Sequence, residues 1–160
     1  MTTALFPGSF DPFHNGHLEV VERALALFDA VVVAVVRNPA KREPLFGLDE
    51  RIALITACVG ASARLRIVAM ERELTVTVAR SVGADVIVRG VRAVSDFENE
   101  LQMAQMNRQL AGVETLFVPT GSSYSFIASR LIREVARYHG DVSAFVPAPV
   151  AQMMKERFGG

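Results

Sequence analysis

The feature that most constrains the fold is a run of seven small and β-branched residues, Ala-Val-Val-Val-Ala-Val-Val, at positions 30–36. A strand with one face in water alternates apolar and polar residues, whereas this run contains no polar residue. It therefore predicts a strand that is covered on both faces. Such strands are typical of parallel sheets between two layers of helices, so the run favours an α/β fold.

Strand and helix patterns alternate along the rest of the chain. The expected strands are residues 2–6, 30–36, 65–69, 85–88 and 115–118. The expected helices are 18–28, 48–59, 74–81, 96–110 and 125–138, followed by a short helical region from residue 141 or 143 that two prolines interrupt. This order predicts one domain, 1–160, with a doubly wound (Rossmann-like) five-stranded parallel sheet and helices on both faces. Sheets of this kind bind ligands at the carboxyl ends of their strands.

Composition excludes several classes of protein. Lys and Arg balance Asp and Glu at 17 each, so no bulk field recruits nucleic acid or an anionic membrane, and neither is expected as a partner. No apolar run approaches the roughly 18 residues that span a bilayer, and no targeting segment begins the chain, so we expect a cytoplasmic protein. Cys58 is the only cysteine, which rules out an intrachain disulfide and a cysteine metal cluster.

The stretch from Phe6 to His17 concentrates the chemistry. Its twelve residues hold two prolines, two glycines, a serine, an aspartate and two of the three histidines. A glycine-containing turn between a strand and a helix brings backbone N–H groups and the positive helix end to a phosphate. Two other interpretations of His14 and His17 stay open: they only cap the helix, or they bind a metal, although His139 is the sole further histidine.

The segment Gly-Ser-Phe-Asp-Pro-Phe-His-Asn-Gly-His at 8–17 resembles the signature of the nucleotidyltransferase superfamily, whose (Thr/His)-x-Gly-His motif binds the nucleotide triphosphate. A second segment, Val-Arg-Gly-Val-Arg-Ala-Val-Ser-Asp-Phe-Glu-Asn-Glu-Leu-Gln-Met-Ala-Gln-Met-Asn at 88–107, resembles the bacterial phosphopantetheine adenylyltransferases, which act in the penultimate step of coenzyme A synthesis. The similarity extends from residue 5 to about residue 147. It implies transfer of the adenylyl group of ATP to 4′-phosphopantetheine, giving dephospho-CoA and pyrophosphate.

The resemblance also implies roles for individual residues. Ser9 and His17 would contact the triphosphate, and His17 would stabilise the transition state. Lys41 would bridge the acceptor phosphate and the α-phosphate, Arg89 would hold the acceptor phosphate, and Thr75 would line the pantetheine site. The matching ATP-binding positions are Ser9, Phe10, His17, Gly90, Val91, Arg92, Glu100, Tyr124, Ser125, Phe126, Ile127, Ala128, Ser129 and Arg130.

The chemistry agrees with these roles, because a phosphate nucleophile is already anionic at neutral pH and needs no general base. The site must instead supply in-line positioning and positive charge. The resemblance implies Mg²⁺ bound mainly through the ATP phosphates and no metal held by protein residues. It also implies a homo-oligomer, in the family typically a hexamer, and CoA as an inhibitor.

Three positions depart from the family pattern. Ala128 and Arg130 stand where relatives carry hydroxyl residues, and Asn99 stands where an aromatic residue is common. Ala128 and Arg130 leave open a non-catalytic nucleotide-binding or CoA-sensing module. A sister transferase that acts on nicotinamide mononucleotide or glycerol phosphate is the other alternative, and the segment 89–107 argues against it.

Simpler structural roles also stay open for some residues. Arg89 and Arg92 are alternatively solvated surface charges, and Glu100 is alternatively a partner of Arg108 or another surface charge. The stripe of Met103, Met106 and Leu110 is expected to form core or subunit packing.

Overall fold

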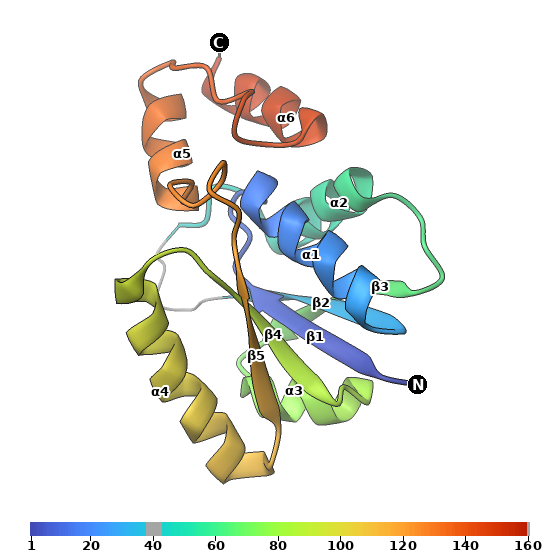
Figure 1. Ribbon diagram of the computed structural model, residues 1–160. Helices are drawn as coiled ribbons and strands as arrows, with labels where there is room; N and C mark the ends of the chain where they lie inside the picture. Colours follow the sequence, from blue (N-terminus) through green and yellow to red (C-terminus); the bar gives the residue numbers. More distant parts are fainter. Residues whose placement is uncertain (38–42, 160) are drawn as a thin grey trace.

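The computed structural model describes residues 1–37 and 43–159. Its elements are β1 (Thr3–Gly8), α1 (Asn15–Leu27), β2 (Ala30–Arg37), α2 (Leu48–Val59), β3 (Leu65–Glu71), α3 (Thr75–Val82), β4 (Val86–Val91), α4 (Val94–Ala111), β5 (Glu114–Pro119), α5 (Ser129–Arg137) and α6 (Ala148–Phe158). The five strands form one parallel sheet in the order β3-β2-β1-β4-β5 (Figure 1). The predicted fold class is confirmed.

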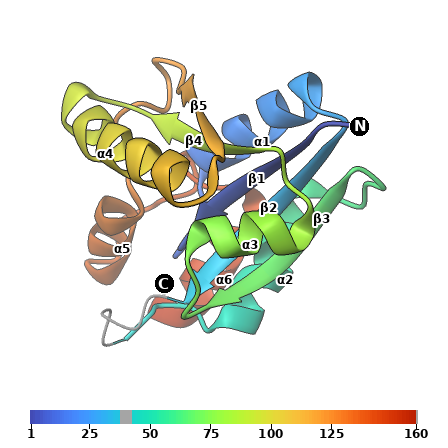
Figure 2. The same cartoon turned by 90° about the horizontal axis from the view of Figure 1, so that it is seen from below.

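The run of β-branched residues in β2 lies between two apolar layers, as its pattern predicts. Val31, Val33 and Val35 belong to one core cluster, which includes residues of α1, α2, α5 and α6. Val32 and Ala34 point to the other face and pack in a second cluster with residues of α3. Figures 1 and 2 show α1 and α2 on one side of the sheet and α3 and α4 on the other.

The sheet changes direction at the pair β1–β4, because crossovers from β1 build outward to β3 on one side and from β4 to β5 on the other. β1 pairs with β2 from Thr3 to Gly8. Its pairing with β4 is limited to Ala4↔Val86 and Leu5↔Ile87. The two strands therefore part toward their carboxyl ends, where ligands of doubly wound sheets bind.

The C-terminal third contains two departures from the predicted elements. The helix expected at 125–138 begins only at Ser129, because residues 122–126 form turns instead. Pro147 and Pro149 were expected to interrupt a helix, but they start α6: Pro147 is its N-cap and Pro149 lies in its first turn. The first turn of a helix has no intrahelical partner for its N–H groups, so proline costs little there.

Two predicted helix boundaries are confirmed. α2 has the predicted bounds, and Gly83 ends α3 with a φ of 69°, as a left-handed C-cap glycine should.

The apolar stripe of α4 is not core in this chain, since Met103, Met106 and Leu110 are 54%, 55% and 54% exposed. Of the two roles expected for this stripe, core packing is wrong, and subunit packing stays a prediction.

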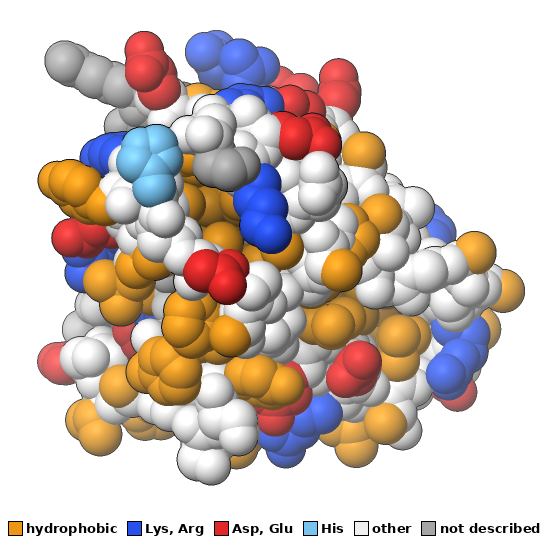
Figure 3. Space-filling view, turned by 90° about the horizontal axis from the view of Figure 1, so that it is seen from above, with side chains coloured by type: hydrophobic (Ala, Val, Ile, Leu, Met, Phe, Trp, Pro, Cys, Tyr) orange, Lys and Arg blue, Asp and Glu red, His pale blue; other side chains and the backbone are white. Residues whose placement is uncertain are grey.

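The surface bears on possible partners. Among the described residues, no helix combines the length and apolar character needed to cross a bilayer. On the face in Figure 3, Lys and Arg side chains are interspersed with Asp and Glu side chains and with hydrophobic patches. Charge on this face is thus mixed rather than gathered in one field.

We expect Leu5→Ala to lower the free energy of unfolding by about 2–5 kcal/mol, because it opens a cavity in the second core cluster. Leu5 is 0% exposed in the central strand. The matched control is Leu27→Ala at the end of α1, where the side chain is 69% exposed and a change within about 0.5 kcal/mol is expected. Urea unfolding followed by circular dichroism measures both, and equal losses would contradict this assignment of the core.

Candidate active site

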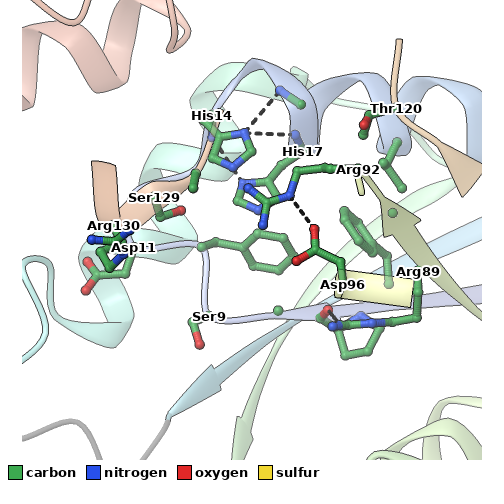
Figure 4. Close-up of a pocket in the computed structure, with 18 of the residues that line it drawn as sticks. Ser9, Asp11, His14, His17, Arg89, Arg92, Asp96, Thr120, Ser129 and Arg130 are labelled. Atoms are coloured by element: carbon green, nitrogen blue, oxygen red, sulfur yellow. Dashed lines mark hydrogen bonds and ion pairs between the residues drawn. The ribbon is translucent and has the colours of Figure 1, made fainter. Parts of the chain in front are cut away.

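A cavity of about 490 Å³ opens at the carboxyl ends of β1 and β4. It is bordered by the turn after β1, the start of α1, the end of β4, the first half of α4 and the start of α5 (Figure 4). The lining residues are Phe6, Pro7, Gly8, Ser9, Phe10, Asp11, His14, Gly16, His17, Val20, Arg89, Gly90, Arg92, Asp96, Asn99, Glu100, Thr120, Ala128, Ser129, Arg130 and Arg133.

His14 caps α1 with its side chain. Its Nδ1 accepts hydrogen bonds from the backbone N–H of Gly16 at 3.1 Å and of His17 at 3.3 Å. A Cβ on Gly16 would lie 3.0 Å from the His14 ring, so glycine at this position leaves room for the cap. His14 therefore caps the helix as one interpretation expected, and its ring also lines the cavity.

His17 also belongs to the cap, but its other ring nitrogen stays available. The backbone N–H of His14 donates to its Nδ1 at 3.2 Å, and the two imidazoles stack with centroids 3.6 Å apart. A neutral ring that accepts at Nδ1 carries its proton on Nε2. His17 can thus cap the helix through one nitrogen and donate a hydrogen bond through the other.

The surroundings keep the His17 ring neutral. Phe10 meets it edge-on at a centroid distance of 4.9 Å, and Phe13 lies at 5.6 Å. Burial lowers the pKa of His17 well below 6.5, with further contributions from the neighbouring His14 ring and from the positive charges of Arg92 and Arg89. At neutral pH the ring is a neutral hydrogen-bond donor beside the cavity rather than an acid.

Arg89 extends from β4 into the gap between β4 and β1. It donates to both carboxylate oxygens of Glu100, at 2.7 and 2.6 Å, and to the carbonyl of Pro7 at 2.6 Å. Glu100 therefore pairs with Arg89, and Arg108 pairs instead with Glu114 at 3.1 Å. The interpretation of Arg89 as a solvated surface charge, and that of Glu100 as the partner of Arg108, are both wrong.

Arg92 ties the end of β4 to two other segments. It donates to Asp96 in α4 at 3.0 Å and to the carbonyl of Ile127, before α5, at 2.6 Å. Figure 4 shows its pairing with Asp96 beside the two stacked histidines. Arg92 is likewise not a solvated surface charge, since its side chain is 31% exposed.

Of the residues that the structure describes, four arginines and three carboxylates line the cavity, and each of these carboxylates already has donors. Asp11 accepts from two backbone N–H groups, Asp96 from Arg92 and Glu100 from Arg89. Arg130 is 75% exposed, and its ion pair with Glu134 is long at 3.6 Å. The cavity thus offers positive charge to an anion more readily than it offers a free carboxylate.

The structure places most predicted site residues around one cavity. Those that line it are Ser9, Phe10, His17, Arg89, Gly90, Arg92, Glu100, Ala128, Ser129 and Arg130. Those outside its lining are Thr75 at the start of α3, Val91 at the end of β4, and Tyr124, Ser125, Phe126 and Ile127 in the turn before α5. Lys41 lies outside the described residues.

The lining also includes residues that the sequence did not single out. Asp11, Asp96, Thr120 and Arg133 face the same cavity. Arg133 lies four residues after Ser129 on α5, and its guanidinium donates to the carbonyl of Asp11. Helical spacing from Ser129 was the one signal that pointed to Arg133, whereas Thr120 carried none.

Metal ligation by the histidine pair receives no support from the geometry, because the Nδ1 atoms of His14 and His17 both accept backbone N–H groups. In the described part of the chain, no three His, Cys, Asp or Glu residues gather as a metal-binding group. Cys58 lies half-buried in α2, and burial raises the pKa of its thiol to about 11.

We expect His14→Asn to reduce the loss of stability in acid. Burial, aided by Arg92, lowers the pKa of His14 from 6.5 to about 3. Protons therefore bind the unfolded chain preferentially between these values, and stability falls as pH drops through this window by up to about 1.4 kcal/mol per unit. Asparagine keeps a capping oxygen without titrating. Urea unfolding at pH 7, 6, 5 and 4.5 measures the slopes, and parallel curves for the two proteins would contradict the expectation.

The chain is similar to a known protein family and to named proteins within it. The cytidylyltransferase-like family model matches residues 5–135. Phosphopantetheine adenylyltransferase of Gloeobacter violaceus is 51% identical over 158 residues, which cover 98% of this chain and 97% of that protein. The corresponding protein of Alkaliphilus metalliredigens is 47% identical over 158 residues (98% and 99% covered), and that of Heliobacterium modesticaldum 48% over 160 residues (99% and 94%).

A solved structure shows the same fold. The crystal structure of the lipopolysaccharide core biosynthesis protein from Thermoplasma volcanium GSS1 superposes with a TM-score of 0.57 at 23% identity, covering 76% of this chain and 97% of that one. At that identity the likeness concerns the fold alone. The family match and the near-complete coverage of the curated relatives show that the chain belongs to the cytidylyltransferase-like family and, within it, to the phosphopantetheine adenylyltransferases.

Proposed function

We propose that this chain transfers the adenylyl group of ATP to 4′-phosphopantetheine, giving dephospho-CoA and pyrophosphate. The observation that carries the proposal is 47–51% identity, over nearly the whole chain, to relatives with that activity in their name. The cavity supports it, because a neutral imidazole donor and several arginines meet at the open end of β1 and β4.

The proposed reaction is an in-line displacement at the α-phosphorus. An oxygen of the acceptor phosphate forms a bond to this phosphorus while the bond to the bridging oxygen of the β-phosphate breaks, and pyrophosphate leaves with the electron pair. No proton has to leave the nucleophile. This agrees with a cavity in which Asp11, Asp96 and Glu100 already accept hydrogen bonds.

His17 is the proposed transition-state stabiliser. Its Nε2–H would donate to an α-phosphate oxygen, where charge develops during the displacement. A neutral donor suits this role because it keeps its proton throughout the reaction. Ser9, in the turn between β1 and α1, would contact the triphosphate together with His17, and Phe10, Gly90, Arg92 and Glu100 would bind ATP from the same cavity.

Arg89 is proposed to hold the acceptor phosphate. The two-point pair with Glu100 fixes the plane of its guanidinium, and a phosphate would replace or share the contact with the carbonyl of Pro7. Lys41, Thr75, Val91 and residues 124–127 keep their predicted roles from the family resemblance.

The start of α5 is proposed to bind the terminal phosphates of ATP. Ser129 uses its hydroxyl to donate to the carbonyl of Pro12 at 2.9 Å, and Ala128 has no hydroxyl to offer. The N–H groups of the first turn and the exposed guanidinium of Arg130 would then replace the hydroxyl contacts that this chain lacks.

Mg²⁺ is proposed to bind mainly through ATP. The described residues include no carboxylate-rich cage, which suits an ion that keeps its waters and binds substrate phosphates. When bound, it would neutralise part of the triphosphate charge. The protein groups would bind and orient the phosphates.

The same resemblance leads us to propose a homohexamer and inhibition by CoA. A cytoplasmic location is proposed separately, from the sequence pattern. The exposed apolar side chains of α4, including Met103, Met106 and Leu110, suit a contact between subunits.

We expect the purified chain, with ATP, Mg²⁺ and 4′-phosphopantetheine, to release pyrophosphate and form dephospho-CoA in equal amounts, measured by coupled assay and mass spectrometry. CTP replaces ATP in one parallel reaction, and nicotinamide mononucleotide or glycerol phosphate replaces the acceptor in two others. Turnover with only one of these would identify a sister transferase. Binding of ATP without turnover of any acceptor would identify the non-catalytic module.

We expect His17→Ala to lower kcat by about 10²–10³-fold, the usual effect of losing one donor to a developing charge. The dissociation constant of ATP should change less than about threefold, because the contact strengthens in the transition state. His17→Gln, which restores an N–H donor, should recover part of the rate. Parallel losses of rate and ATP affinity would mean that His17 serves ground-state binding only.

A further inference from the structure

Asp11 and Arg51 are two buried side chains of opposite charge beside the cavity, and each is held by backbone groups. Each residue is 4% exposed. Burial lowers the pKa of the Arg51 guanidinium, and the charge of Asp11 opposes that shift. A buried guanidinium without partners is costly, so its hydrogen bonds indicate what it does.

The guanidinium of Arg51 joins three segments. Its Nη1 donates to the carbonyl of Ser9 at 2.6 Å and to that of Val36, near the end of β2, at 2.9 Å. Its Nε donates to the carbonyl of Phe46 at 3.1 Å. One side chain of α2 thus holds the turn after β1, the end of β2 and the approach to α2 in a fixed relation.

Asp11 completes the same connection from the opposite side. One of its carboxylate oxygens accepts from the N–H of Leu45 and the other from that of Phe46, both at 2.9 Å. The turn after β1 is therefore attached to residues 45–46 through a carboxylate and to Arg51 through a carbonyl. We refer to these two side chains and their backbone partners as the Asp11–Arg51 clamp.

The clamp acts on a strained part of the turn. Phe10 has a φ of 50°, a left-handed conformation that is unfavourable for a bulky residue. The carbonyl held by Arg51 belongs to Ser9, and the peptide that follows it leads directly into Phe10. Holding this carbonyl fixes the orientation of the peptide between the two residues, both of which line the cavity.

We propose that Arg51, balanced by Asp11, is a positioning residue that keeps Ser9 and Phe10 in the geometry required for adenylyl transfer. Arg51 is not among the lining residues, so it acts through the turn. The inference rests on the proposed function for its rate measurements, and the structural clamp can also be tested by binding.

The test is a double-mutant cycle between Arg51→Lys and Ser9→Ala. Lysine keeps the charge but lacks the planar fork that reaches three carbonyls. Arg157→Met is the matched control, because Arg157 contacts the same approach to α2, donating to the carbonyl of Leu45 at 2.6 Å and lying 5.1 Å from the centroid of the Phe46 ring. No contact of Arg157 with Ser9 or Val36 occurs among the described hydrogen bonds.

We expect Arg51→Lys to lower kcat/KM at least tenfold in protein that is folded at the assay temperature by circular dichroism. The double variant should fall within about threefold of the worse single variant, because both changes disturb one turn. Arg157→Met should stay within about threefold of the original rate and add independently to Ser9→Ala. Should Arg51→Lys fail to fold, Asp11→Asn provides the same cycle with the guanidinium retained.

Additive effects of Arg51→Lys and Ser9→Ala would overturn the inference and leave the proposed function standing. An equal rate loss in Arg157→Met would also overturn it, since loosening residues 45–46 would then suffice. If the unsubstituted chain has no adenylyltransferase activity, the proposed function fails. The same double-mutant cycle is then measured on the dissociation constant of ATP. Non-additive changes in this constant would support the clamp, and additive changes would overturn it.

Discussion

The short pairing of β1 with β4 is the constraint on which the site depends. Two residue pairs join these strands, and beyond them the carboxyl ends diverge. Where the two strands diverge, they no longer supply hydrogen-bond partners to each other's backbone groups. Arg89 replaces one of these partners by donating to the carbonyl of Pro7. The arginine that is proposed to hold a phosphate is therefore also a connection between the diverging strands.

Structural and chemical roles coincide in the turn after β1. His14 and His17 exchange hydrogen bonds with the start of α1, and this same exchange places the proton of neutral His17 on Nε2. Phe10 packs against the His17 ring in a strained conformation, and Arg51 holds the peptide before it. Helix capping and preparation of a hydrogen-bond donor are thus two consequences of one arrangement.

The sequence predicted well the helix boundaries that follow from local patterns. It predicted less well the segments whose structure depends on tertiary contacts. The bounds of α2 and the end of α3 at Gly83 follow from periodicity and from glycine at a left-handed position. The start of α5 did not, because residues 122–126 form turns before Ser129. The prediction that Pro147 and Pro149 interrupt a helix was wrong for a related reason. The free-energy cost of a proline depends on whether it lies inside a helix or in its first turn.

The sequence by itself determined the layered α/β fold, through a strand without polar residues, and the position of the turn that is proposed to bind phosphate, through glycine, serine and histidine at a strand–helix junction. Only the tertiary structure decided the partners: Glu100 for Arg89, and the Ser9 carbonyl, 42 residues away in the chain, for Arg51. Periodicity and turn chemistry are local properties that neighbouring residues express. The partner of a buried charge is set by packing between distant segments, and that packing exists only in the folded chain.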